Sequence, residues 1–254
     1  MKDTNMRTKI IAGNWKMNND IAQSTELING LKSLVASAKS TVIICPPFTS
    51  LSIAHQLIAN TNIKLGAQDV SLYDSGAYTG EISLSMLKSV GCSYVIVGHS
   101  ERRQYHHETN EVINQKAKKV LAGGLIPIIC IGETLEEREK NITSQVLTTQ
   151  VKGVLAGLPA ADIEKSIVAY EPVWAIGTGK TASKEQAEEA HQLIRNVIGQ
   201  LYSAAVAEKV IIQYGGSVKA DNAKELLSQP NIDGALVGGA CLKAESFAAI
   251  ISAV

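Results

Sequence analysis

A carboxylate stands directly before a glycine-rich segment in the run Ala169–Lys180, AYEPVWAIGTGK. Glu171 ends an apolar, β-type stretch and is followed at once by proline. Close to the apolar residues Val173, Trp174 and Ile176, its pKa should be raised toward the working pH, as a general base requires. We therefore interpret Glu171 as the base in a proton transfer. The alternative interpretation is an exposed carboxylate at the end of a strand.

The segment that follows Glu171 has the composition of a lid. Apolar side chains can exclude water from a site, and glycines allow the backbone to bend. Glycines also leave backbone N–H groups open, so that they can bind an anion. We expect this segment to cover the site that contains Glu171.

Other polar residues follow other apolar runs in the same way. His99 could donate a hydrogen bond to an oxygen on which negative charge develops, or it could cap the following helix. Lys16 could neutralise an anionic substrate or an enolate, form a Schiff base, or simply lie in solvent. Asn14 precedes Lys16 in the same short segment, and Glu101 follows His99.

Two glycine-rich turns, Gly215-Gly216-Ser217 and Gly238-Gly239, follow the last apolar runs. Both leave N–H groups open to a phosphate, although paired glycines also occur in plain tight turns. The sequence has neither nucleotide-binding glycine motif, and its His, Asp and Glu residues lack metal-ligand spacing. We therefore expect no metal and no cofactor. A base, an imidazole and a cation suit proton transfer beside the carbonyl of a small phosphorylated substrate.

Eight short apolar runs must position these groups. They are almost continuously apolar, which is typical of strands buried on both faces of a sheet. Stretches with helical spacing lie between them, including Ile21–Val35, Val112–Leu121, Gln186–Tyr202 and Ala244–Val254. The apolar runs are Lys9–Gly13, Thr41–Cys45, Ile63–Ala67, Tyr94–Val97, Ile126–Ile131, Ile167–Tyr170, Val210–Tyr214 and Ala235–Val237.

This alternation predicts an α/β fold, a closed eight-stranded parallel (β/α)8 barrel, with a doubly wound open sheet as the alternative. We expect one catalytic domain over residues 1–254, with residues 1–7 as an N-terminal tail. The active site of such a barrel lies at the carboxyl ends of the strands, where the last two loops frequently bind phosphate. The residues described above would therefore meet on one face.

One connection, Gln68–Ser83, is long for a compact domain. Connections of this length are usually functional or lie at an interface. A mobile surface loop is the alternative.

The overall composition excludes several classes of protein. The 254 residues contain 24 Lys+Arg and 24 Asp+Glu, so the chain lacks the basic footprint of a nucleic-acid binder. No run approaches the ~20 apolar residues of a membrane span. The N-terminus lacks the apolar core of a secretory signal, and Met6 is an alternative start. Because Cys45, Cys92, Cys130 and Cys241 form no C-x-x-C pair, we expect free thiols and a cytoplasmic location.

Taken together, these residues resemble the triosephosphate isomerase family. The resemblance runs in the expected order from about Lys9 to the C-terminus, so it covers nearly the whole chain. It implies a TIM barrel and a cofactor-independent enzyme of glycolysis and gluconeogenesis. The segments that carry it are Ala12–Asn18, Gly76–Glu81, Val97–Arg103, Cys130–Thr134, Ala169–Thr181, Gln213–Val218 and Gly234–Gly239.

The resemblance implies interconversion of dihydroxyacetone phosphate and D-glyceraldehyde 3-phosphate through an enediolate. Glu171 would move a proton between C1 and C2, and neutral His99 would polarise the carbonyl. Lys16 and Asn14 would add electrostatic and hydrogen-bond support, with Trp15 in the same binding segment. Backbone N–H groups would hold the phosphate at Gly177, Ser217, Gly238 and Gly239.

The same resemblance implies a hinged lid and a homodimer. The lid, from its first hinge to the start of its second, comprises Pro172, Val173, Trp174, Ala175, Ile176, Gly177, Thr178, Gly179 and Lys180. A second segment resembles the family's dimer loop, which inserts into the partner subunit near the partner's Lys16. The dimer loop comprises Tyr78, Thr79, Gly80 and Glu81.

Two alternative functions stay open. A Schiff-base aldolase on a similar barrel would need a buried lysine at a strand end, whereas the sixth apolar run ends in Glu171. A phosphate-binding or adhesion protein could keep the fold without activity, although intact Glu171, His99 and Lys16 argue against it.

Overall fold

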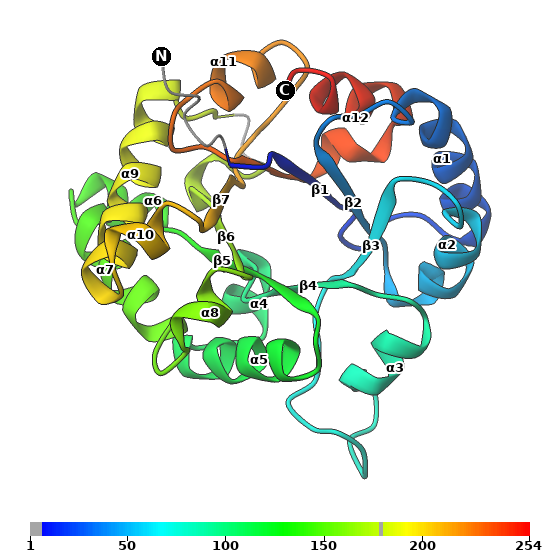
Figure 1. The fold of residues 1–254 in the computed structure, drawn as a ribbon, viewed down its shortest axis with the longest axis horizontal. Coiled ribbons are helices and arrows are strands. Elements are labelled where there is room, and N and C mark those ends of the chain that lie inside the picture. The colour runs from blue at the N-terminus through cyan, green and yellow to red at the C-terminus, as the bar shows by residue number, and fades with distance from the viewer. Residues whose placement is uncertain (1–6, 178–179) are drawn as a thin grey trace.

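The computed structural model describes residues 7–177 and 180–254, in which parallel strands close into a barrel surrounded by helices (Figure 1). The first strand pairs with the second and also with the eighth, so Ile10 lies opposite both Thr41 and Gly234. The doubly wound open sheet is therefore excluded. The strands are β1 Ile10–Asn14, β2 Thr41–Cys45, β3 Ile63–Ala67, β4 Tyr94–Val97, β5 Ile126–Ile131, β6 Ile167–Tyr170, β7 Ile211–Tyr214 and β8 Gly234–Val237.

Every expected strand is confirmed, and no strand end differs from its expected position by more than one residue. Helices connect consecutive strands and form the outer ring of Figure 1. The helices are α1 Ile21–Leu34, α2 Leu51–Leu57, α3 Leu84–Ser89, α4 Ser100–Tyr105, α5 Asn110–Ala122, α6 Leu135–Glu139, α7 Thr143–Val154, α8 Ala160–Ile163, α9 Lys184–Leu201, α10 Ala204–Ala207, α11 Ala223–Leu227 and α12 Ala244–Ile251. Short 3-10 turns cover Phe48–Ser50, Val173–Ala175 and Gly239–Leu242.

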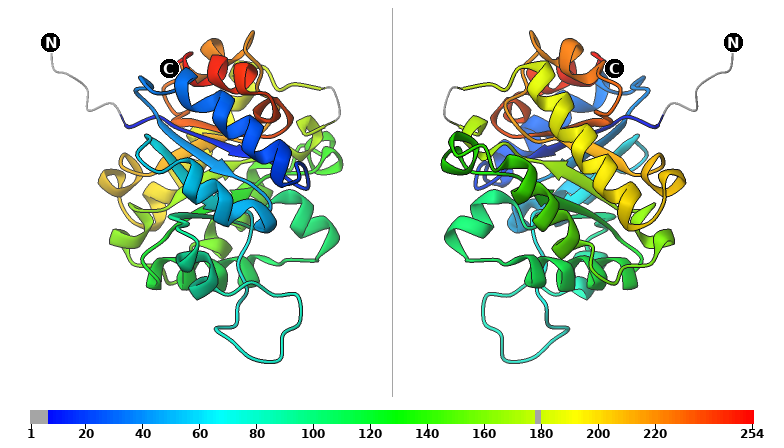
Figure 2. Two further views of the ribbon diagram at one scale, coloured as in Figure 1. Left: turned by 90° about the vertical axis from the view of Figure 1, so that its right-hand side faces the viewer. Right: turned by 90° about the vertical axis from the view of Figure 1, so that its left-hand side faces the viewer.

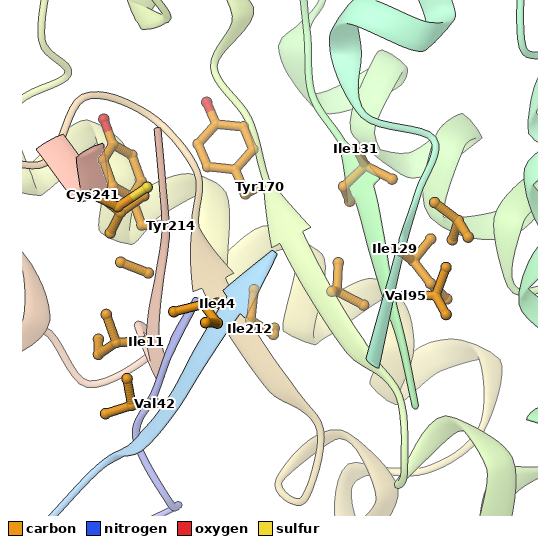
Figure 3. Close-up of a cluster of buried hydrophobic side chains, with 14 of the residues drawn as sticks. Ile11, Val42, Ile44, Val95, Ile129, Ile131, Tyr170, Ile212, Tyr214 and Cys241 are labelled. Atoms are coloured by element: carbon orange, nitrogen blue, oxygen red, sulfur yellow. The ribbon is translucent and has the colours of Figure 1, made fainter. Parts of the chain in front are cut away.

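Alternate residues of the strands form two separate cores. Those that point outward pack against the helices, and Figure 3 shows Ile11, Val42, Ile44, Val95 and Ile129 among them. Those that point inward fill the barrel, so it is a packed core rather than a pore. The inner core is Ile10, Ala12, Ile43, Cys45, Ile96, Ile128, Cys130, Ile167, Ala169 and Leu236. Because the interior is filled, polar side chains gather at the strand ends.

The long connection between β3 and α3 projects beyond the ring of helices (Figures 1 and 2). Its aromatic rings Tyr73 and Tyr78 stack with centroids 3.7 Å apart and planes 7° apart. Backbone bonds from Tyr78 to Gly76 and from Glu81 to Tyr78 shape the turn. The loop is therefore a structured arm with Thr79 at its exposed end.

The N-terminal segment is anchored from Arg7 onward. Arg7 Nε lies 2.6 Å from Asp233 Oδ1, and Arg7 Nη1 lies 2.8 Å from Glu208 Oε2. Arg7 is thus bound to the barrel rather than part of a tail, and residues 1–6 lie outside the described residues. In the part of the chain that the structure describes, no helix combines the length and apolar character of a membrane span.

Gly234, at the start of β8, lies where β8 packs closely against β1 to close the barrel. It has φ +150°, and a Cβ there would lie 1.9 Å from the carbonyl oxygen of Ile10. We expect Gly234→Ala to destabilise the fold by more than about 2 kcal/mol, because both the backbone conformation and the space oppose a side chain. Gly199→Ala inside α9, where a Cβ would be 3.7 Å from its nearest neighbour, should be neutral or stabilising. Thermal unfolding of both variants measures this, and equal midpoints would contradict it.

His191 on α9 gives a prediction of pH dependence. Its ring is fully buried against Tyr170 and Tyr214, with centroids 5.5 and 6.1 Å away. Burial lowers the pKa of His191 from 6.5 to about 4. The unfolded chain therefore takes up this proton at a higher pH than the folded chain. Stability should fall by about 3 kcal/mol as the pH drops through this interval.

Denaturant unfolding of His191→Gln across this pH interval measures that contribution. The free energy of unfolding of the variant should depend less steeply on pH than that of the native chain. His55→Gln is the control, because His55 is exposed on α2, and it should keep the native slope. A native slope in His191→Gln would contradict the prediction.

Candidate active site

A cavity of about 370 Å³ lies at the carboxyl ends of the strands. Most of the predicted site residues meet there although they come from distant parts of the sequence. From β1 and the segment after it come Asn14 and Lys16, from the end of β4 comes His99, and from the end of β6 comes Glu171. The glycine-rich side of the cavity is lined by Gly177, Gly215, Gly216, Ser217, Gly238 and Gly239.

Glu171 is buried at the base of this cavity and is 1 % exposed. Its Oε2 accepts a hydrogen bond of 2.8 Å from the backbone N–H of Ser100. Its Oε1 lies 3.0 Å from His99 Nε2. Within the described residues, Oε1 is buried and lacks an aligned hydrogen bond. Oε1 therefore faces His99, while Oε2 faces the backbone of Ser100.

His99 begins α4, and its place at the helix start fixes the ring. The backbone N–H of Glu101 donates to His99 Nδ1 at 3.2 Å, so Nε2 carries the proton of the neutral ring. Burial lowers the pKa of His99, whereas the carboxylates of Glu171 and Glu101 raise it, and the net direction is upward. A second proton at Nδ1 would displace the Glu101 N–H, so this hydrogen bond favours the neutral ring, whereas the two carboxylates favour the charged ring. Nε2–H is then the group that His99 offers to a ligand.

The pKa of Glu171 differs from the sequence-based prediction. Burial raises the pKa of Glu171, as expected. His99 and the hydrogen bonds from Ser100 and Cys130 lower this pKa by more, so the net direction is downward. The expectation of a raised pKa is therefore wrong for this arrangement. The carboxylate at the end of β6 is ionised and held by groups at the end of β4.

Lys16 extends into the same cavity from the segment after β1. Its Nζ lies 2.5 Å from Glu101 Oε1, so this carboxylate orients the lysine. Its backbone has φ +52°, a left-handed conformation that is uncommon for residues other than glycine. The backbone N–H of Lys16 donates to Asn14 Oδ1 at 3.0 Å. Asn14 thus shapes the turn that aims the ammonium group.

The opposite side of the cavity is built from backbone. A Cβ on Gly215 would lie 2.8 Å from Glu171 Cγ, so a side chain at that position would displace the carboxylate. Gly238 lies beside Lys16, since a Cβ there would be 3.6 Å from the lysine Cε. The exposed Lys219 also lines the cavity. Sequence reasoning missed Lys219, because no pattern separates it from other surface lysines.

A buried carboxylate, Glu133, holds the start of the segment that the sequence predicts as a lid. It is 0 % exposed and accepts hydrogen bonds from Tyr170 Oη at 3.1 Å and from Trp174 Nε1 at 2.9 Å. Arg138 Nη1 lies 3.3 Å from the same oxygen, and its guanidinium lies 5.0 Å from the centre of the Trp174 ring. Sequence reasoning did not assign this role, because the partners of Glu133 come from β6 and the lid.

Other predicted residues lie elsewhere. Trp15 is fully buried in the outer core and does not line the cavity, so the structure does not bring its side chain to the site. In the lid, Val173–Ala175 forms a 3-10 turn and Gly177 has φ +68°. Thr178 and Gly179 lie outside the described residues. Within the residues described, no group of three or more His, Cys, Asp or Glu side chains could hold a metal ion.

A second cavity, of about 490 Å³, adjoins the first on the far side of Lys16. Exposed Met17 and Tyr105 line it together with Phe48. Lys16, His99 and Glu101 reach into this cavity from the site. This apolar rim lies next to the charged groups of the first cavity.

Comparison with known proteins agrees with this geometry. The family model described as triosephosphate isomerase matches residues 9–254. The chain belongs to the triosephosphate isomerase family. It is 53 % identical over 247 residues to a triosephosphate isomerase of Clostridium botulinum (strain ATCC 19397 / Type A), covering 97 % of this chain and 100 % of the relative. It is 55 % identical over 250 residues to that of Prosthecochloris aestuarii (strain DSM 271 / SK 413), covering 98 % of each.

The Glu133 cluster gives a prediction about stability. Glu133→Leu removes the acceptor shared by Tyr170, Trp174 and Arg138, and should cost on the order of 3 kcal/mol. Glu133→Gln keeps an acceptor oxygen and should cost about 1 kcal/mol. Glu136→Leu, at an exposed position on α6, which begins two residues after Glu133, should cost less than about 0.5 kcal/mol. Thermal unfolding ranks the three variants, and a leucine at residue 133 as mild as that at residue 136 would contradict the role.

Proposed function

We propose that this chain interconverts dihydroxyacetone phosphate and D-glyceraldehyde 3-phosphate, with Glu171 as the base that moves the proton. One observation carries the proposal. The buried Glu171 carboxylate lies 3.0 Å from His99 Nε2, in a cavity whose opposite wall is glycine backbone. A base and a hydrogen-bond donor at this spacing can act on a carbonyl and the carbon next to it.

Binding would orient the substrate by its phosphate. Backbone N–H groups at Gly177, Ser217, Gly238 and Gly239 can surround an anion without side chains in the way. The Lys16 ammonium, next to Gly238, adds positive charge on the same side. The reacting carbons would then lie between this wall and Glu171.

The positions of His99 Nε2 and the Glu171 carboxylate suggest how the proton would move. His99 Nε2–H would donate to the carbonyl oxygen, on which negative charge develops. Glu171 would take the proton from the adjacent carbon, forming an enediolate. His99 would move the hydroxyl proton from one oxygen of the enediolate to the other, and the protonated carboxyl would return its proton to the other carbon. The product then carries the carbonyl on the neighbouring carbon, the base is restored, and no redox partner is needed. Lys16 would stabilise the enediolate charge.

The lid would protect the intermediate. Ala175, Ile176 and Gly177 line the cavity, so a closed lid can exclude water from the enediolate. Exclusion of water strengthens the electrostatic contacts and keeps the phosphate from leaving. Trp174, held by Glu133, would act as the hinge.

The alternative functions are less well supported. A Schiff-base lysine must be a neutral nucleophile, whereas the Lys16 ammonium is paired with Glu101 at 2.5 Å. Borohydride trapping with substrate would show a covalent adduct on Lys16 if the aldolase interpretation held. A silent phosphate-binding protein would bind phosphate without turnover, although the base and donor are in place.

We further propose that the chain acts as a homodimer in the cytoplasm and forms one catalytic domain. The projecting arm at Tyr78, Thr79, Gly80 and Glu81 would enter the second cavity of a partner. That cavity is lined by exposed Met17 and Tyr105 and adjoins Lys16. The four cysteines are free and buried, which suits a reducing compartment.

The direct test is turnover of D-glyceraldehyde 3-phosphate, coupled to NADH oxidation through glycerol-phosphate dehydrogenase. We expect fast turnover that is blocked by a phosphorylated two-carbon acid resembling the enediolate. A folded protein that binds the acid without turnover would refute the isomerase function.

Shortening the base should slow the reaction without unfolding the chain. Glu171→Asp withdraws the carboxylate by about one ångström and should lower kcat roughly 10²-fold. Glu111→Asp, at an exposed position on α5, should leave kcat unchanged. Steady-state assays measure both variants, and native turnover in Glu171→Asp would exclude Glu171 as the base.

The projecting arm should contribute to association of two subunits into the homodimer. Thr79→Arg places a long charged side chain at its end and should weaken the dimer and the activity together. Thr149→Arg, exposed on α7, should change neither property. Sedimentation and assays at equal protein concentration measure this, and a fully active Thr79→Arg monomer would overturn the interface.

A further inference from the structure

The backbone of Lys16 is held in a conformation that its own residue type disfavours. A lysine at φ +52° is in the left-handed region, which costs on the order of 1 kcal/mol and persists only when neighbours hold it. Two side chains do so. Asn14 Oδ1 accepts from the Lys16 N–H at 3.0 Å, and Gln68 Nε2 donates to the Lys16 carbonyl at 2.8 Å.

The Gln68 amide ties this turn to the barrel. Its Nε2 also donates to the carbonyl of Cys45 at 2.9 Å, at the end of β2. The same carbonyl accepts from the Trp15 N–H at 3.1 Å. Both acceptors of Gln68 are carbonyl oxygens, so the amide nitrogen must face them. Gln68 therefore joins the strand ends of β1, β2 and β3 on the side of Lys16.

Gln68 is itself held firmly through the residue that follows it. The Asp69 carboxylate is largely buried and lies 2.6 Å from Lys116 Nζ and 2.9 Å from Arg102 Nη2. Glu108 binds the same two cations, at 2.6 and 2.7 Å. This network of four charges fixes the root of the long connection against α4 and α5. The backbone that carries the Gln68 side chain is therefore held rigidly.

We infer that Gln68 is a positioning residue that acts on the reaction through Lys16. Gln68 does not line the cavity that holds Glu171 but the second cavity, on the far side of the lysine. Its hydrogen bond keeps the Lys16 backbone left-handed, so that Nζ reaches both Glu101 and the glycine wall. The inference rests on the proposed function, in which Lys16 stabilises the phosphate and the enediolate.

The test is a double-mutant cycle between Gln68 and Lys16. Gln68→Met keeps the length of the side chain and removes the donor. In the native background it should lower kcat/KM by about 10- to 100-fold, because the ammonium is misplaced. In the Lys16→Met background the same substitution should change kcat/KM by no more than about twofold, because the group through which Gln68 acts is gone.

Controls separate this role from simple stability. Gln229→Met, before β8 and so at the opposite end of the barrel, should leave kcat/KM unchanged. Circular dichroism and thermal unfolding check that each variant is folded. If Gln68→Met does not fold, Gln68→Glu, which alters only one group at the tip, takes its place in the same cycle.

The outcomes are distinct. A loss that disappears in the Lys16→Met background supports the inference. Native activity in the folded Gln68 variant, or an equal loss in both backgrounds, overturns it and leaves the proposed function intact. Absence of turnover in the native chain would instead refute the proposed function.

Discussion

The burial of the Glu171 charge beside His99 is the constraint on which the rest of the site depends. An ionised carboxylate removed from water is costly unless other groups compensate it. Here the N–H of Ser100 and the ring of His99 provide that compensation. Both come from the end of β4, whereas Glu171 follows β6, and the pairing of β5 with both strands brings these ends together.

Neighbouring groups restrict the conformations of the Glu171 and His99 side chains. Gly215 leaves room for the carboxylate, and the helix start at Glu101 fixes the tautomer of His99. Lys16 is aimed by a left-handed turn that no isolated lysine would favour. The site is therefore pre-organised by backbone at nearly every point. Glu171 and Lys16 bring the charges that would act on a substrate.

Sequence reasoning could predict the strands and most of the site, for a definite physical reason. Buried parallel strands leave continuous apolar runs, and the polar residue after each run is placed at the barrel's carboxyl end. Long-range contacts could not be predicted in this way. The lowered pKa of Glu171 depends on His99 and Ser100 from another strand. Trp15 stands between two residues that line the cavity, yet its side chain turns to the outer core.

The most direct measurement of the central claim is isomerisation in D₂O followed by NMR. If Glu171 takes a proton from one carbon and returns one to the next, the carboxyl can exchange that proton with solvent. We therefore predict that part of the product carries deuterium on the carbon next to the carbonyl, and that Glu171→Gln abolishes both turnover and incorporation. Turnover without any deuterium, as in a direct hydride shift, would contradict the account.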